Sequence, residues 1–121
     1  MTITQPSLLD LAPVIPVVVI GDRADAVPMA RALVAGGVPV IEVTLRSAAA
    51  LDAIRAIATE VPEMTVGAGT ICTAEQVDAA MGAGARFLVS PGATDRLLDA
   101  LQAGPLPFLA GTATPDRKSV V

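Results

Sequence analysis

Three polar side chains are spaced two residues apart in residues 40–46, which read VIEVTLR. Side chains alternate between the two faces of an extended strand, so Glu42, Thr44 and Arg46 share one face. A carboxylate in a dry site has a raised pKa and can transfer protons near neutral pH, while an arginine fork suits a substrate carboxylate. The spacing therefore predicts either an acid/base group beside an anion binder, or a structural ion pair between Glu42 and Arg46.

Glycine and hydroxyl residues recur at three later positions where strands are expected to end. Residues 66–71 (VGAGTI) contain two glycines and Thr70, residues 90–94 read SPGAT, and residues 110–115 read AGTATP. Glycine allows a ligand to approach the backbone, and threonine or serine offers a hydroxyl. Each segment alone is compatible with a plain tight turn. Together they predict one functional rim at the ends of successive strands.

The absence of histidine limits the chemistry of this chain. It removes the commonest general base, the commonest zinc ligand and any Ser-His-Asp arrangement, so we expect no metal site and no cofactor. Cys72 is the single cysteine, which prevents a disulfide within the chain. We interpret it as a half-buried thiol rather than as a nucleophile.

Charge and hydropathy argue against two classes of partner. The net charge is -4, the seven arginines are scattered and the single lysine is Lys118, whereas nucleic-acid binding depends on clustered basic residues. The strongest apolar run, residues 11–20, is short and contains Pro13 and Pro16, unlike a membrane helix or a signal peptide. We therefore expect a soluble, cytoplasmic protein that binds neither nucleic acid nor membrane.

Short runs rich in β-forming residues alternate with stretches that carry apolar residues at helical spacing. The expected strands are residues 14–20, 38–45, 65–69, 86–90 and 107–110, and the expected helices carry apolar stripes within residues 26–34, 51–61, 77–81 and 97–101. A short leading helix is expected at residues 7–11. A composition that is 53% hydrophobic but only 2% aromatic favours a helix-covered parallel sheet. The fold class is thus α/β, either a doubly wound sheet or part of a (β/α)8 barrel.

Capping residues mark the ends of the expected helices. Thr73 with Gln76 has the pattern of a capping box, and Thr94 is expected to cap the following helix. Three glycines stand where helices should end: Gly36, Gly84 and Gly104.

A dinucleotide site is the main alternative use of the glycines. It would need Gly-x-Gly-x-x-Gly directly after a strand. Gly67 and Gly69 supply the first two glycines, but Cys72 occupies the third position, so the pattern disfavours this alternative.

Several ordered motifs resemble one known family, the bifunctional aldolases for 2-keto-3-deoxy-6-phosphogluconate (KDPG) and 4-hydroxy-2-oxoglutarate. The similarity runs from about residue 13 to residue 115. The motifs are PVVVI at residues 16–20, VPMARAL at residues 27–33 followed by Gly36 and Gly37, EVTLR at residues 42–46, VGAGT at residues 66–70 and SPG at residues 90–92.

The resemblance implies a (β/α)8 (TIM) barrel, usually a homotrimer, that cleaves KDPG to pyruvate and glyceraldehyde 3-phosphate in the Entner-Doudoroff route without a metal. In that family a lysine on the sixth strand forms a Schiff base with the keto-acid phosphate substrate. By the same resemblance Glu42 is the general acid/base, Arg46 and Thr70 bind the pyruvyl part, and Pro91 is a wall of that pocket. Thr44, which shares the face of Glu42, joins the expected substrate-binding residues.

The lysine content departs from the family pattern. Residues 1–115 contain no lysine, and Lys118 follows the fifth expected strand rather than lying on a sixth. We therefore interpret residues 1–115 as the N-terminal part of a single barrel, with about five strands and four helices and without the Schiff-base lysine. The isolated chain is expected to be inactive and, with unpaired strand edges, poorly soluble.

Residues 116–121 (DRKSVV) look like a non-native tail. One back-translation of these residues matches the start of a common sequencing adapter, so an adapter-derived tail is our hypothesis. A natural frameshift and a genuine short paralogue are the alternatives.

Other functions also stay open. The parent enzyme could act on 4-hydroxy-2-oxoglutarate or on the galactonate epimer of KDPG, and the chain itself could be a non-catalytic fragment. A phosphate-binding barrel of the thiamine-phosphate synthase type is disfavoured, because it would not need the pair Glu42 and Arg46.

Overall fold

The computed structural model describes residues 14–111, in which strands and helices alternate. The elements are β1 (Val17–Val18), the 3-10 helix η1 (Arg23–Asp25), α2 (Ala26–Ala35), β2 (Val40–Thr44), α3 (Ala50–Glu60), β3 (Thr65–Gly69), α4 (Ala74–Ala83), β4 (Leu88–Ser90), α5 (Asp95–Ala103) and β5 (Phe108–Ala110).

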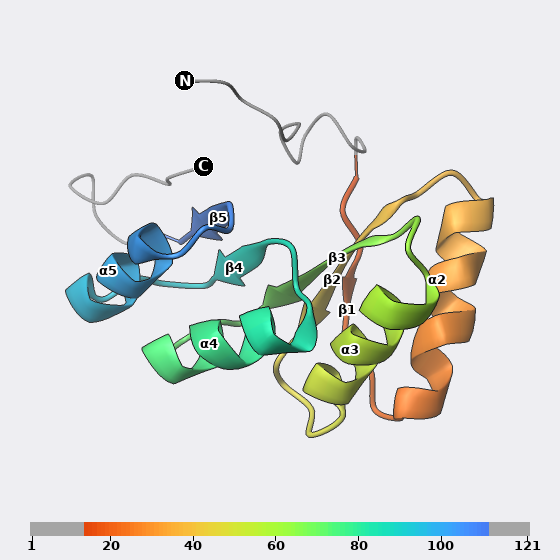
Figure 1. Ribbon diagram of the computed structural model, residues 1–121, viewed down its shortest axis with the longest axis horizontal. Coiled ribbons are helices and arrows are strands. Elements are labelled where there is room, and N and C mark those ends of the chain that lie inside the picture. Colours follow the sequence, from red (N-terminus) through yellow and green to blue (C-terminus); the bar gives the residue numbers. More distant parts are fainter. Residues whose placement is uncertain (1–13, 112–121) are drawn as a thin grey trace.

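The strands form one parallel sheet in the order β1-β2-β3-β4-β5 (Figure 1). Each strand pairs with the next strand in the sequence. A doubly wound sheet would instead reverse its strand order and carry helices on both faces. Here each right-handed crossover leads to the next strand on the same side, which puts every helix on one face of the sheet. This strand order is that of the first half of a (β/α)8 barrel.

The expected strands and helices within the described residues are all present. β3 has the expected bounds, whereas β1, β2, β4 and β5 are shorter than the expected runs. β1 is shortest, because it is an edge strand that pairs only with β2 and directly follows Pro16, which has no N–H to donate. The short helix η1, begun by the Asp22 side chain accepting from the Ala24 N–H at 2.9 Å, was not expected.

The expected helix caps are confirmed. Thr73 and Gln76 form a complete capping box at the start of α4, and the Thr94 hydroxyl accepts a hydrogen bond from the Leu97 N–H at 3.1 Å. Gly36, Gly84 and Gly104 are the C-caps of α2, α4 and α5. The leading helix expected at residues 7–11 and the tail at residues 116–121 lie outside the described residues.

The two faces of the sheet have different surroundings. One face packs against the helices through a core that includes Ile41, Val43 and Ala68 from the strands and Ile54 and Ile57 from α3. Alanines at the helix contacts allow the helix layer to approach the sheet closely.

A smaller cluster lies on the opposite face. Val40 and Phe87 are buried there, with Ile15, Val89 and Leu109 packed against them. A Cβ added at Gly67 would overlap the Phe87 ring, so the ring lies directly over this glycine. The alternation along β2 puts Glu42 and Thr44 on the same face as Val40.

Candidate functional site

Glu42 is buried on the strand face that lies away from the helices. Its exposed fraction is 8%, and every residue of β2 is buried. The ladder pairs Glu42 with Gly67 and Thr44 with Gly69. A Cβ added at Gly69 would overlap the Glu42 carboxylate, so this carboxylate lies directly over Gly69. Gly69 is two residues after Gly67, the residue that pairs with Glu42 in the ladder.

Burial changes the acid strength of this residue. Desolvation raises the pKa of the Glu42 carboxyl above its ordinary value. Glu42 and Arg46 form no ion pair, which removes the structural alternative considered for these two residues. Within residues 14–111 the ion pairs are exposed ones on the helix layer, Arg55 with Asp52 at 3.1 Å and Arg96 with Glu75 at 3.3 Å.

Arg46 is placed differently from the strand prediction. β2 ends at Thr44, and Arg46 lies two residues later in the turn toward α3, where it is exposed. The ladder therefore does not fix its side chain on the face of Glu42. Arg46 still follows the end of β2 by only two residues, and its side chain is accessible from solvent.

Thr44 is buried with a free hydroxyl. Its exposed fraction is 3%, and its Oγ1 atom has no hydrogen-bond partner within the described residues. A buried hydroxyl without a partner destabilises a fold by about 1–3 kcal/mol. The position of Thr44 next to Glu42 therefore needs an explanation beyond packing.

Thr70 follows β3 with an unusual backbone. Its φ of 59° lies in the left-handed region, which residues with a Cβ seldom adopt. The residues on both sides of it are held by hydrogen bonds, because the Leu45 N–H donates to the Gly69 carbonyl at 2.9 Å and the Ile71 N–H donates to the Val89 carbonyl at 3.0 Å. Strained residues held in this way cluster at functional sites.

Pro91 begins a tight turn after β4. The Ser90 hydroxyl donates to the Gly92 carbonyl, and the Gly111 N–H donates to the Ser90 carbonyl at 2.7 Å. A Cβ at Gly111 would overlap the Pro91 carbonyl group, so these two strand ends are in close backbone contact. Ser90 and Gly111 thus support the turn at Pro91, a role that the sequence motifs alone did not reveal.

These segments meet at one edge of the sheet. Parallel strands end on the same side, so Arg46, Thr70 and Pro91 follow β2, β3 and β4 at a common rim, with the Glu42 carboxylate below it. The expected glycine and hydroxyl segments that follow β3 and β4 therefore lie along this rim, and their functional role stays a prediction. The threonines of residues 112–115 lie outside the described residues.

The prediction for Cys72 is wrong. The thiol is exposed, not half-buried, and its Sγ lies 3.6 Å from the Thr70 carbonyl. The reason is local, because the Cys72 N–H donates to the Gln76 side chain at 2.7 Å, which places the residue in the loop before α4 and outside the core. Within residues 14–111 no group of three potential ligands could hold a metal ion.

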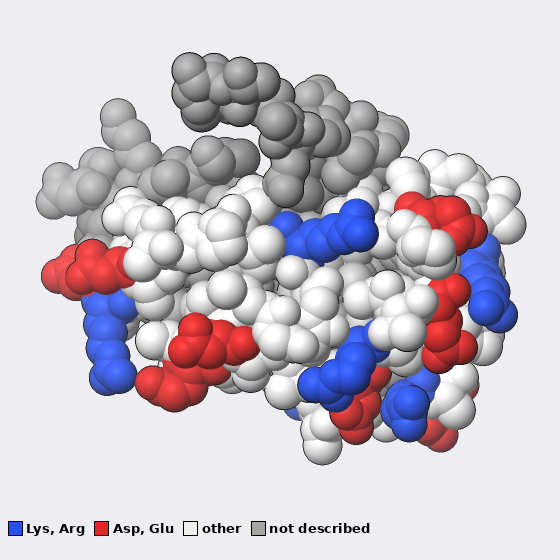
Figure 2. All heavy atoms as spheres, viewed as in Figure 1, with Lys and Arg blue, Asp and Glu red and all other residues white. Residues whose placement is uncertain are grey.

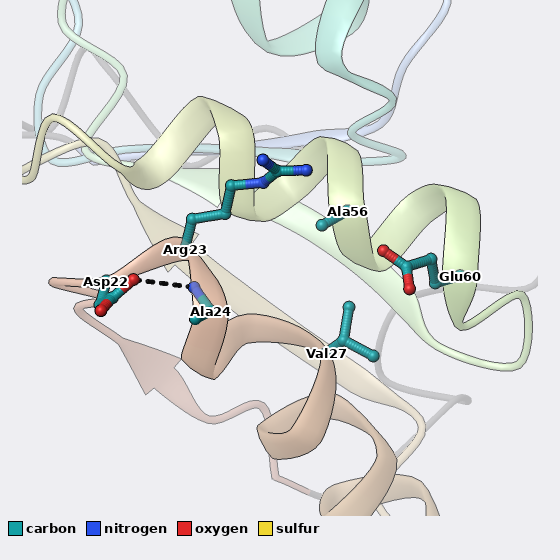
Figure 3. A pocket seen from close by; sticks show the side chains of 6 residues that line it. All are labelled: Asp22, Arg23, Ala24, Val27, Ala56 and Glu60. Atoms are coloured by element: carbon teal, nitrogen blue, oxygen red, sulfur yellow. Dashed lines mark hydrogen bonds between the residues drawn. The ribbon is translucent and has the colours of Figure 1, made fainter.

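A hollow of different character lies on the helix layer. Figure 3 shows it between η1 with the start of α2 and the outer side of α3, where Arg23 and Glu60 point toward its opposite ends. On the face seen in Figure 2, acidic and basic side chains are interspersed and form no basic stripe. Among the described helices, none is long and apolar enough to cross a membrane.

Sequence comparison identifies relatives over most of the chain. The family model described as KDPG and KHG aldolase matches residues 6–119. The chain is 54% identical over 108 residues to the KHG/KDPG aldolase of Escherichia coli (strain K12), which corresponds to 89% of this chain and 51% of the relative. It is 58% identical over 88 residues to the 2-dehydro-3-deoxy-phosphogluconate aldolase of Zymomonas mobilis, covering 73% of this chain and 42% of the relative.

Solved structures give the same picture. The KDPG aldolase of Legionella pneumophila, captured with pyruvate as a covalent carbinolamine intermediate, superposes with a TM-score of 0.84 at 44% identity over 88% of this chain and 52% of that one. The aldolase of Zymomonas mobilis ZM4 with 3-phosphoglycerate gives a TM-score of 0.82 at 52% identity over 88% and 50%. The chain therefore spans about half the length of the relatives that it matches.

Proposed function

Since the chain belongs to the KDPG and KHG aldolase family, we propose that it supplies the acid/base part and the carboxylate-binding part of a class I aldolase site. The whole protein would be a lyase that cleaves 2-dehydro-3-deoxy-6-phosphogluconate (KDPG) to pyruvate and glyceraldehyde 3-phosphate. The observation that carries this proposal is a buried Glu42 carboxylate below the rim formed by the ends of β2, β3 and β4.

Glu42 is suited to move protons in both directions. Because burial raises the pKa of its carboxyl, the group is closer to half protonation near neutral pH than an exposed glutamate would be. It would donate a proton while the Schiff base forms, and accept one from the substrate hydroxyl as the carbon-carbon bond breaks. The covalent step itself needs a lysine, which residues 1–115 do not contain.

The rim residues would bind the pyruvyl part of the substrate. The exposed Arg46 guanidinium has the donor geometry for a carboxylate. Thr70 would offer its hydroxyl from a backbone held by hydrogen bonds on both sides. Pro91 would form a wall of the pocket, and Thr44 would contact the substrate from the face of β2 that carries Glu42. A homotrimeric, cytoplasmic enzyme is part of the same proposal.

A second substrate follows from the name of one relative. The Escherichia coli protein is named a KHG/KDPG aldolase, and the proposed acid/base and carboxylate contacts serve either keto acid. We therefore include 4-hydroxy-2-oxoglutarate as an alternative substrate of the whole protein. The galactonate epimer of KDPG is a further alternative, since nothing in the proposed contacts selects one epimer.

The proposal can be tested with a chimera. Residues 1–111 of this chain would be joined to the second half of the Escherichia coli relative, which is 54% identical over the shared first half, and pyruvate release from KDPG would be measured. We expect an active chimera whose activity falls by about 100- to 10,000-fold on Glu42→Gln. A folded Glu42→Gln chimera with full activity would refute the role of Glu42.

The 121-residue chain provides the complementary measurement. We expect no covalent adduct above background after incubation with pyruvate and borohydride, because Lys118 is its single lysine and follows the fifth strand. A stoichiometric adduct on Lys118 would mean that the chain is itself a complete Schiff-base site.

A further inference from the structure

The free hydroxyl of Thr44 is the starting point. Within the described residues, Thr44 Oγ1 is buried and has no hydrogen-bond partner, although a threonine hydroxyl can both donate and accept. Valine has nearly the same shape without this cost. A buried hydroxyl at such a position indicates that it finds a partner in another state of the site.

The Glu42 carboxylate is the candidate acceptor for this hydroxyl. Thr44 pairs with Gly69 in the ladder, and the Glu42 side chain extends along β2 until its carboxylate lies over Gly69. Thr44 and Glu42 therefore share one face of one strand, and the Glu42 carboxylate lies over the residue that pairs with Thr44.

The neighbouring strands offer no competing charged group. β1 and β3, which flank β2, contain no titratable residue, and β1 carries Val17 opposite Glu42. β3 carries glycines opposite both Glu42 and Thr44. The nearest charged group along β2 is Arg46, which is exposed in the following turn and forms no ion pair with Glu42.

We propose that Thr44 is a positioning residue for Glu42, whose hydroxyl donates a hydrogen bond to the Glu42 carboxylate when that carboxylate is ionised and releases it on protonation. This role deepens the proposed function and rests on it for its catalytic meaning, since it orients the acid/base group during proton transfer.

Titration of Glu42 in the 121-residue chain tests the proposal without any aldolase activity. The side-chain carboxyl carbon of Glu42 would be followed by NMR against pH in the wild type, Thr44→Val and Thr44→Ser. A hydrogen bond to the charged form lowers a pKa, so its loss in Thr44→Val should raise the pKa of Glu42 by about one unit or more. Thr44→Ser keeps the hydroxyl and should stay within about 0.3 units of the wild type.

Two results would overturn the proposal. The first is a Glu42 titration in Thr44→Val that coincides with the wild type, and the second is a shift in Thr44→Ser as large as that in Thr44→Val. Both variants are close in shape to threonine, so each is expected to fold. An inactive chimera would contradict the proposed function and leave this titration unaffected, which separates the two failures.

Thermal unfolding at several pH values gives an independent readout. If the hydroxyl bonds only the ionised carboxylate, Thr44→Val should melt at a higher temperature than the wild type where Glu42 is protonated, and should lose that advantage where Glu42 is ionised. A hydroxyl that is merely unsatisfied would give Thr44→Val the same advantage at every pH. That result would also overturn the proposal.

Discussion

At the scale of single residues, burial of Glu42 couples the stability of the fold to pH. Desolvation raises the folded-state pKa of this carboxyl above 4.5, the value of an unperturbed glutamate. At lower pH the group is protonated in both the folded and the unfolded chain. As pH rises, the unfolded chain ionises first, so the stability is present at acidic pH and is lost as pH passes from 4.5 through the raised pKa.

Replacing Glu42 by glutamine should remove this loss. We expect Glu42→Gln to have nearly the wild-type free energy of unfolding at about pH 4 and to exceed it increasingly toward about pH 8, measured by urea denaturation. Glu63→Gln, an exposed change in the loop between α3 and β3, controls for the removal of one negative charge. A Glu42→Gln advantage that does not grow with pH would contradict a desolvated carboxylate.

Gly69 should be needed for the position of the Glu42 carboxylate. The new Cβ in Gly69→Ala would overlap that carboxylate, which is the flexible end of its side chain and can move aside. We therefore expect a stability cost of about 1–3 kcal/mol together with a large loss of aldolase activity in the chimera. Gly21→Ala, where a Cβ meets nothing within 4 Å, is the matched control.

Wild-type activity in a folded Gly69→Ala chimera would show that the carboxylate acts from another position.

The sequence could not predict the contact between the Glu42 carboxylate and Gly69. Strand alternation predicts which face Glu42 and Thr44 share. The position of the Glu42 carboxylate over Gly69 depends instead on the side-chain rotamer of Glu42, which reaches across to β3. The left-handed backbone of Thr70 is equally invisible in the sequence, because threonine seldom adopts it.

At the scale of elements, local signals predicted most of the fold. The helices were found because apolar spacing, the Thr73 capping box and the terminal glycines agree with one another. The lengths of β1, β2, β4 and β5 were less predictable, since a strand ends where its neighbour stops pairing with it. The same dependence explains Arg46, which was expected on β2 but follows its end.

Two glycines near the end of α4 provide an internal comparison. Gly84 has a φ of 103°, and a Cβ there would lie 2.8 Å from the Ala58 Cβ, whereas a Cβ at Gly82 meets nothing within 4 Å. We expect Gly84→Ala to destabilise the fold by about 1–2 kcal/mol and Gly82→Ala to stabilise it by about 0.5–1 kcal/mol, both measured by chemical denaturation. Equal effects would mean that the left-handed cap does not control how α4 ends.

At the scale of the whole molecule, the sheet has one face under the helices and one face that is partly open. The exposed large apolar residues within residues 14–111 gather at β1 and beside it: Val14, Val17 and Val19 have exposed fractions of 63%, 64% and 57%. β1 is also an edge strand of a parallel sheet. Parallel sheets are normally covered on both faces, and an apolar edge strand promotes association between chains.

We therefore expect the 121-residue chain to self-associate through this edge, and Val17→Lys to reduce the association in sedimentation velocity experiments. Lysine on an edge strand opposes pairing with another sheet. Ala32→Lys on the exposed side of α2 adds the same charge to the helix-covered layer and serves as the control. The wild type is acidic, with a net charge of -4, so added positive charge alone would increase association. A decrease in association with Val17→Lys, without a decrease with Ala32→Lys, must therefore come from the β1 edge. Equal sedimentation of both variants and the wild type would place the association elsewhere or exclude it.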